Sequence, residues 1–146
     1  MRILIINGPN LNLLGKRDES NYGKLSLTGI EEKLKEEFPN EDFSFFQSNH
    51  EGEIIDKIQN ADNNFDAIVI NPGGFAHSSV AIRDALAEVK LLKIEVHLSN
   101  LSKRENFRQN LITASACEGY ISGFKEESYS AAVHLIGKYL KVKGQS

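Results

Sequence analysis

Arg17 and Tyr22 stand close together in a long segment, 7–22, that also contains two glycines, Gly8 and Gly15. A guanidinium beside a phenol stabilises the phenolate, and a phenolate can act as a general base. Because connections of this length without secondary structure of their own are often functional lids, we predict a lid that carries a tyrosine base. The alternative is an exposed loop in which the arginine is solvated and the tyrosine packs its ring on the surface.

Acid and imidazole groups alternate in a second segment, where Glu95, His97 and Ser99 are separated by apolar residues. An extended backbone places these three side chains on one side, because side chains alternate along a strand. A carboxylate beside an imidazole orients the ring and favours its protonated form, which prepares a histidine for general acid catalysis. The alternative is a buried Glu–His pair that contributes only to conformational specificity.

The segment 71–79 combines a proline, a pair of glycines, His77 and a pair of serines. Glycines let the backbone approach a ligand closely, and the serines can cap the helix that follows. The pattern is similar to an anion cradle, although it has neither the lysine of a P-loop nor the spacing of a dinucleotide-binding motif. His77 is either a ligand contact or a loop histidine that takes no part in a reaction.

The composition restricts the partners that this chain can have. The formal net charge is −3 and no run of lysines or arginines exceeds two residues, so nucleic-acid binding is not expected. The apolar run at 2–6 is too short for a membrane span or a signal peptide, which predicts a cytoplasmic protein with no membrane partner. We interpret the single cysteine, Cys117, as a small core residue, with nucleophilic catalysis as the alternative.

Hydrophobic periodicity predicts the elements that must position these groups. Short apolar runs indicate strands at 2–6, 43–46, 67–70, 92–98 and 119–122. Helical spacing indicates helices that begin at Ser26 and end before Pro39, and others at 51–58, 78–89 and 128–140. In the first helix, Thr28 and Glu31 have the spacing of a capping box. The alternation predicts one α/β domain over 1–146, with a parallel sheet and a ligand beyond the carboxyl ends of its strands.

Four ordered blocks carry a resemblance to a known family over nearly the whole chain. They are Asn7-Gly8-Pro9-Asn10-Leu11-Asn12-Leu13-Leu14-Gly15 with Arg17 and Tyr22-Gly23; Phe46-Gln47-Ser48-Asn49-His50-Glu51-Gly52-Glu53; Asn71-Pro72-Gly73-Gly74 with His77, Ser79 and Arg83-Asp84-Ala85; and Ile94-Glu95-Val96-His97-Leu98-Ser99-Asn100 with Arg104 and Arg108. Together these blocks resemble the type II dehydroquinases, which are 3-dehydroquinate dehydratases.

The resemblance implies a flavodoxin-like α/β fold, a five-stranded parallel sheet with helices on both faces. It also implies dehydration of 3-dehydroquinate to 3-dehydroshikimate, in the shikimate pathway of aromatic amino acid biosynthesis, by anti elimination through an enolate. Neither a Schiff base, a cofactor nor a metal is expected. The same resemblance implies a homo-oligomer in which trimers pack into a dodecamer.

The resemblance further implies individual roles. Tyr22 would be the base, with its phenolate stabilised by Arg17, and Asn10 would help hold a water that polarises the enolate. His97 would protonate the departing hydroxyl and would be oriented by Glu95. The implied catalytic residues are therefore Tyr22, His97, Arg17, Asn10 and Glu95. The implied substrate-binding residues are Asn71, His77, Asp84, Leu98 through its backbone, Ser99 and Arg108, with Asp84 reaching the site of a neighbouring subunit.

Other functions fit parts of the sequence. A flavodoxin-like nucleotide- or phosphate-binding domain would use the 71–79 segment and explain the fold, but it would give no role to Tyr22 and His97. A lysine could instead form a Schiff base with the same substrate. A homo-oligomer with a purely structural role would need none of these groups.

Overall fold

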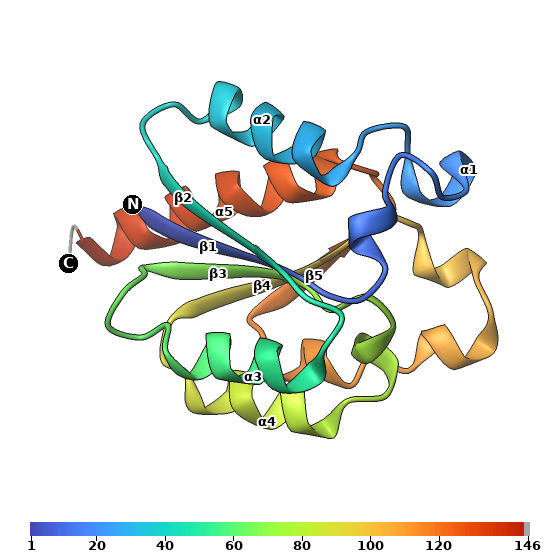
Figure 1. The fold of residues 1–146 in the computed structure, drawn as a ribbon. Coiled ribbons are helices and arrows are strands. Elements are labelled where there is room, and N and C mark those ends of the chain that lie inside the picture. The colour runs from blue at the N-terminus through green and yellow to red at the C-terminus, as the bar shows by residue number, and fades with distance from the viewer. Residues whose placement is uncertain (145–146) are drawn as a thin grey trace.

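A computed structural model describes residues 1–144, which form one parallel β-sheet with helices. Within these residues the strands are β1 (Arg2–Asn7), β2 (Asp42–Gln47), β3 (Ala67–Asn71), β4 (Leu92–His97) and β5 (Gly119–Ser122). Their order in the sheet is β2-β1-β3-β4-β5, and every neighbouring pair is parallel (Figure 1). This order is that of flavodoxin-like folds, so the predicted fold class is confirmed.

Two helical layers cover the sheet. The helices α2 (Leu27–Glu37) and α5 (Glu127–Gly144) lie on one face, whereas α3 (Glu51–Gln59) and α4 (Val80–Glu88) lie on the other (Figure 1). Ile3 and Ile5 of β1 therefore pack with α2 and α5, and Leu4 and Ile6 pack with α3 and α4. Burial on both faces requires apolar residues at every position, which explains the continuous apolar run of β1.

The ends of the helices differ in detail from the prediction. The capping box at Thr28 is wrong: the N-cap of α2 is Ser26, whose Oγ accepts a hydrogen bond from the backbone N–H of Gly29 at 3.1 Å. The predicted serine cap of α4 is confirmed, because Ser79 Oγ accepts a hydrogen bond from the backbone N–H of Ile82 at 2.9 Å. None of the helices described in residues 1–144 has the length and apolar composition needed to cross a membrane.

The segment 7–22 is more ordered than predicted. It contains a 3-10 helix, Leu11–Leu13, and the short helix α1 (Glu19–Tyr22), so the expectation of a loop without secondary structure is wrong. Leu11 and Leu14 are buried in the core that also contains α2, and they anchor the middle of the segment. Its role as a lid stays a prediction.

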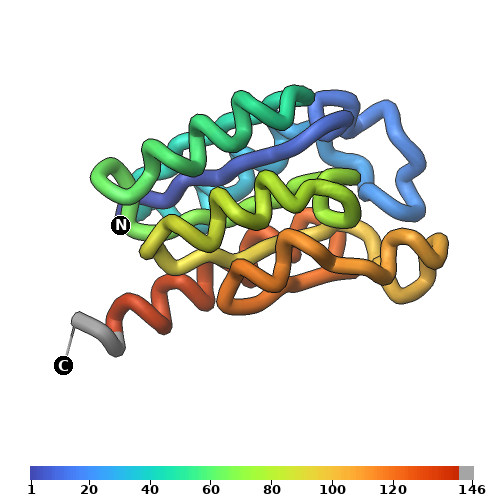
Figure 2. Tube along the Cα trace, turned by 90° about the horizontal axis from the view of Figure 1, so that it is seen from below, coloured from blue at the N-terminus to red at the C-terminus, as the bar shows by residue number. Residues whose placement is uncertain are grey.

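The connections after β1, β3 and β4 gather at the carboxyl-terminal edge of the sheet. Both views place the segments 8–22 and 99–110 at this same end of the molecule, although they are far apart in the sequence (Figures 1 and 2). Asn7 and Asn71 are partners at the ends of β1 and β3, and the backbone N–H of Gly8 donates to the carbonyl of Asn71 at 2.8 Å. The two loops therefore begin in direct contact.

We expect Gly8→Ala to destabilise the protein, because a Cβ at this position would lie 2.4 Å from the carbonyl oxygen of Pro72. The obstacle is backbone, so both loops must shift, and we expect a loss of about 1–3 kcal/mol in the free energy of unfolding. Denaturant unfolding measures this change. Gly52→Ala is the control, since a Cβ on Gly52 in α3 meets nothing within 4 Å. Equal stability of Gly8→Ala and the unsubstituted protein would contradict the close approach.

Candidate active site

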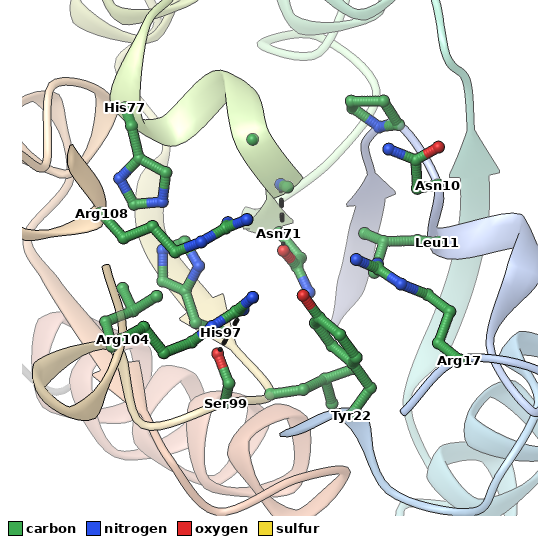
Figure 3. Close-up of a pocket in the computed structure, with 15 residues that line it drawn as sticks. Asn10, Leu11, Arg17, Tyr22, Asn71, His77, His97, Ser99, Arg104 and Arg108 are labelled. Atoms are coloured by element: carbon green, nitrogen blue, oxygen red, sulfur yellow. Dashed lines mark hydrogen bonds between the residues drawn. The ribbon is translucent and has the colours of Figure 1, made fainter. Parts of the chain in front are cut away.

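A cavity of about 520 Å³, open to solvent, lies at the carboxyl-terminal edge of the sheet. Nine of the predicted site residues line it: Asn10, Arg17, Tyr22, Asn71, His77, His97, Leu98, Ser99 and Arg108. The structure therefore brings together side chains from the segments after β1, β3 and β4 (Figure 3). Two predicted residues, Glu95 and Asp84, lie outside the lining.

Tyr22 is held at the end of α1 by the sequence around it. Asp18 caps this helix by accepting a hydrogen bond from the backbone N–H of Ser20 at 3.0 Å, and the hydrogen bonds from Ser20 lower the pKa of Asp18. The carbonyl of Asp18 accepts a hydrogen bond from the backbone N–H of Tyr22 at 2.9 Å. The Cζ atom of Arg17 lies 3.7 Å from the centroid of the Tyr22 ring, so the predicted neighbours are in contact.

A second arginine, Arg104, approaches Tyr22 from the opposite side of the cavity (Figure 3). Its Cζ atom lies 5.1 Å from the Tyr22 ring centroid, and its Nη1 donates a hydrogen bond to Ser99 Oγ at 3.1 Å. Arg104 belongs to the fourth block of the family resemblance, but no role is predicted for it there. A positive charge in the segment after β4 was the feature of the sequence that could have indicated Arg104. Its approach to Tyr22, however, depends on how the two loops fold together.

Arg108 contributes a further positive charge to the cavity. Its Nε donates to both carboxylate oxygens of Glu105 at 3.2 Å, and this contact fixes the position of Nε. Together with Arg17 and Arg104, it makes the lining strongly cationic. A cavity with three guanidinium groups attracts a small anion, and planar guanidinium groups can bind a carboxylate through paired hydrogen bonds.

His97 and Glu95 form a buried pair, as the alternation in β4 predicts. The distance between His97 Nε2 and Glu95 Oε2 is 2.7 Å, and the carboxylate is fully buried behind the imidazole. Because Nε2 is engaged with Glu95, Nδ1 is the nitrogen of His97 that remains for a ligand in the cavity. The second oxygen, Oε1, accepts a hydrogen bond from the hydroxyl of Thr113, which the sequence interpretation did not foresee.

His77 stands beside His97, with the two ring centroids 6.1 Å apart. Its Nδ1 is 3.0 Å from the carbonyl oxygen of Asn110 and must carry a proton to bond with it. Burial lowers the pKa of His77 from its usual value, and the hydrogen bond to Asn110 opposes this change. In the neutral ring, Nε2 is then an acceptor for a hydroxyl group of a ligand.

The amide of Asn71 has a fixed orientation. Its Oδ1 accepts a hydrogen bond from the backbone N–H of Gly73 at 3.1 Å, and its Nδ2 donates to the hydroxyl of Tyr129 at 3.1 Å. Tyr129 is fully buried, and its hydroxyl in turn donates to the side chain of Asn7. The second N–H of Asn71 therefore remains as a donor for a ligand.

Asn10 is one of two residues other than glycine with a positive φ within residues 1–144. Its φ is 69°, a left-handed conformation that asparagine tolerates better than most residues. Its backbone N–H donates to the side-chain oxygen of Asn49 at 3.0 Å. This contact with the segment after β2 holds Asn10 at the rim of the cavity.

Two other residues singled out in the sequence lie away from the cavity. Asp84 is on the exposed side of α4, where its carboxylate pairs with Arg83 at 3.2 Å. Cys117 is partly buried against the core between the sheet, α3 and α4, and burial raises the pKa of its thiol. Its position matches the prediction of a small core residue. Within residues 1–144, no group of three or more His, Cys, Asp or Glu side chains is arranged to hold a metal ion.

The fold and the cavity define a flavodoxin-like α/β protein with a cavity lined by arginines and histidines at the carboxyl-terminal edge of its sheet. A family model described as "Dehydroquinase class II" matches residues 1–137. This chain therefore belongs to the class II dehydroquinase family, as the sequence resemblance predicted.

Individual relatives agree with this assignment. The 3-dehydroquinate dehydratase of Clostridium botulinum is 51% identical over 136 residues, which cover 92% of each chain. That of Carboxydothermus hydrogenoformans is 50% identical over 143 residues, covering 97% of this chain and 93% of its own. The crystal structure of type II dehydroquinase from Butyrivibrio crossotus matches with a TM-score of 0.91 and 47% identity, covering 94% of this chain and 97% of that one.

We expect His77 to titrate below the usual histidine pKa of about 6.5. The fold favours the neutral ring, so the stability that it contributes is present above the unfolded pKa and is lost as the pH falls through the folded pKa. An NMR titration of the ring resonances with isotope-labelled histidine, assigned by comparison with His77→Asn, measures the midpoint. A midpoint at or above that of an unfolded histidine would show that burial does not control this ring.

Proposed function

We propose that this chain dehydrates 3-dehydroquinate to 3-dehydroshikimate by anti elimination through an enolate, with Tyr22 as base and His97 as acid. The observation that carries the proposal is the placement of Tyr22, with Arg17 against its ring, and of His97 in the lining of one cavity. Arg17 lies against Tyr22 on one side, and His97 lies on the other (Figure 3). Glu95 is buried behind His97, with its Oε2 2.7 Å from Nε2 of the ring. The membership of the class II dehydroquinase family supports the substrate and the reaction, a hydro-lyase step of the shikimate pathway.

Tyr22 begins the reaction as a phenolate. It removes the proton from the carbon next to the substrate ketone, and the electrons of that C–H bond move into the ring to form an enolate. Arg17 at 3.7 Å and Arg104 at 5.1 Å from the ring centroid place positive charge on both sides of Tyr22. In the proposed mechanism, these guanidinium groups stabilise the phenolate.

The enolate oxygen then needs stabilisation while the proton is on Tyr22. We assign this to a water held with the help of Asn10, whose left-handed backbone and bond to Asn49 keep it at the rim of the cavity. A positioned hydrogen-bond donor at a developing oxyanion is among the larger contributions to catalysis.

His97 completes the elimination. Its protonated ring donates to the departing hydroxyl, the C–O bond breaks, and water leaves as the carbon–carbon double bond forms. Glu95 stabilises the positive ring and sets its plane through the 2.7 Å contact with Nε2, which directs Nδ1 to the substrate. The base gains one proton and the acid loses one, so transfer of protons with solvent restores both groups for the next turnover.

The remaining residues of the cavity hold the substrate. We assign its carboxylate to Arg108 and the backbone of Leu98 with Ser99, and its ring hydroxyls to Asn71 and His77. A neutral His77 offers an acceptor and Asn71 offers a donor, so the two residues can bind hydroxyl groups in complementary ways.

The proposal includes a homo-oligomer, trimers packed into a dodecamer, in which Asp84 reaches a neighbouring site. The exposed position of Asp84 on α4, outside the cavity of its own chain, supports this assignment. The match of the family model to residues 1–137 supports treatment of the chain as one domain. A cytoplasmic location stays a prediction.

Tyr22→Phe should retain substrate binding and lose turnover, because the ring remains and the base is removed. We expect kcat to fall by about a hundred-fold or more, the usual contribution of a positioned general base. The assay follows the ultraviolet absorbance of the conjugated product formed from 3-dehydroquinate. Tyr139→Phe makes the same chemical change on the exposed side of α5 and should leave kcat unchanged.

The same assay distinguishes the Schiff-base alternative. Borohydride added with 3-dehydroquinate should leave no covalent adduct on the unsubstituted protein, because no imine forms. Near-normal turnover of Tyr22→Phe, or a trapped adduct on a lysine, would contradict the tyrosine mechanism.

Arg17→Lys should lower kcat by about ten-fold to a hundred-fold, the value of one charge-assisted interaction of about 1.5–3 kcal/mol. A flexible ammonium keeps the charge but does not reproduce a planar guanidinium stacked on a phenol ring. Steady-state kinetics measures the change. Lys16→Ala removes a charge from the same segment without touching the cavity, and it should behave as the unsubstituted protein. Full activity of Arg17→Lys would show that the planar contact has no role.

A further inference from the structure

Thr113 lies in the 3-10 helix Thr113–Ala116, outside the cavity and fully buried. Its hydroxyl donates to Oε1 of Glu95, and the other carboxylate oxygen, Oε2, is 2.7 Å from Nε2 of His97. Thr113, Glu95 and His97 thus form a chain of contacts that runs from the helix, through the core, to the wall of the cavity.

The carboxylate of Glu95 depends on both contacts. It is fully buried, and within residues 1–144 these are its two side-chain partners. A buried carboxylate oxygen without a donor carries a large free-energy cost, and a carboxylate held by one oxygen can rotate about its terminal bond. Two partners on different oxygens fix the plane of the group, and they thereby fix the direction from which it meets His97.

We propose that Thr113 is a positioning residue for the elimination: its hydroxyl orients Glu95, which orients the imidazole of His97. The proposal rests on the proposed function, because it requires His97 to be the acid. A residue that orients a reactive histidine through a carboxylate affects the efficiency of proton transfer by that histidine. In metal sites, the outer hydrogen-bond partners of a histidine ligand set the orientation of its ring in a comparable way. Thr113 does not line the cavity, so its effect should fall on turnover and not on binding.

The surroundings of Thr113 explain why its hydroxyl is the group to remove in a test of the contact with Glu95. The helix that contains it packs against α4 and the strands β4 and β5, so its backbone position is set by the fold. The carbonyl of Thr113 accepts a weak contact from Cys117 Sγ at 3.9 Å, which does not involve the side chain. A substitution that keeps the shape and removes only the hydroxyl therefore isolates the bond to Glu95.

Thr113→Val should lower kcat by about ten-fold to a hundred-fold, the range expected when a hydrogen bond to a buried charge is lost. The KM for 3-dehydroquinate should change little, because no substrate contact is removed. Thr113→Ser restores the hydroxyl and should recover most of the turnover, whereas Thr113→Ala should resemble Thr113→Val. If Thr113→Val fails to fold, the comparison of Thr113→Ala with Thr113→Ser gives the same answer.

Ser130→Ala is the matched control. Ser130 is a buried hydroxyl that donates to a carboxylate oxygen of Glu37 at 2.7 Å, between α5 and α2 and away from the cavity. Its removal should cost stability in thermal unfolding without changing kcat. A similar fall in kcat for Ser130→Ala and Thr113→Val would show that lost stability alone explains the effect, and it would overturn the proposal.

The double variant separates action through Glu95 from a direct effect. If Thr113 acts through Glu95, Thr113→Val should add little to the loss already produced by Glu95→Gln, since coupled residues are not additive. Fully multiplicative losses, or normal kcat in Thr113→Val, would overturn the positioning role. His97→Ala tests the underlying function independently: if it retains turnover, the acid assignment fails, whereas an inactive His97→Ala with an active Thr113→Val contradicts only the role of Thr113.

Discussion

Parallel pairing of β1 with β3 determines where the chemistry can occur. The pairing ends with Asn7 opposite Asn71, so the chain leaves both strands at the same edge of the sheet. Tyr129 of α5 contacts both asparagine side chains and thereby joins this edge to a helix from the end of the chain. A side chain at Gly8 would collide with the carbonyl of Pro72, so only glycine fits at this position. The cavity depends on this junction, since its two walls begin there.

The charges of the cavity are distributed unevenly. Three guanidinium groups, those of Arg17, Arg104 and Arg108, line it, whereas the carboxylate of Glu95 is buried behind His97. Cations at the surface of a cleft attract an anionic ligand from solution. A carboxylate behind the imidazole contacts the ring of His97 without facing that ligand. The proposed mechanism uses both arrangements in a single cavity.

Periodicity predicted the five strands from their short apolar runs, which are continuous in β1 and β3, and it predicted α2 to α5 from apolar residues at helical spacing. Period two also placed Glu95 and His97 together, and the family blocks supplied the loop residues that the structure brings to the cavity. The sequence alone did not decide between Ser26 and Thr28 as the cap, since both residue types are found at helix N-termini and Thr28 also has a glutamate three residues later. It could not predict Thr113 or Tyr129 either, because their partners lie far away in the sequence and a buried hydroxyl has no pattern before the fold brings its partner close.

The fixed amide of Asn71 has a stereochemical consequence. With its oxygen bonded to Gly73 and one N–H bonded to Tyr129, the group cannot exchange donor for acceptor by flipping. A ring whose hydroxyl at this point has the opposite configuration would leave the remaining N–H unpaired, at a cost of about 1–3 kcal/mol. If Asn71 binds a ring hydroxyl as proposed, the chirality of the ligand is read by a side chain whose own orientation is set in the core by Tyr129, a residue outside the lining of the cavity.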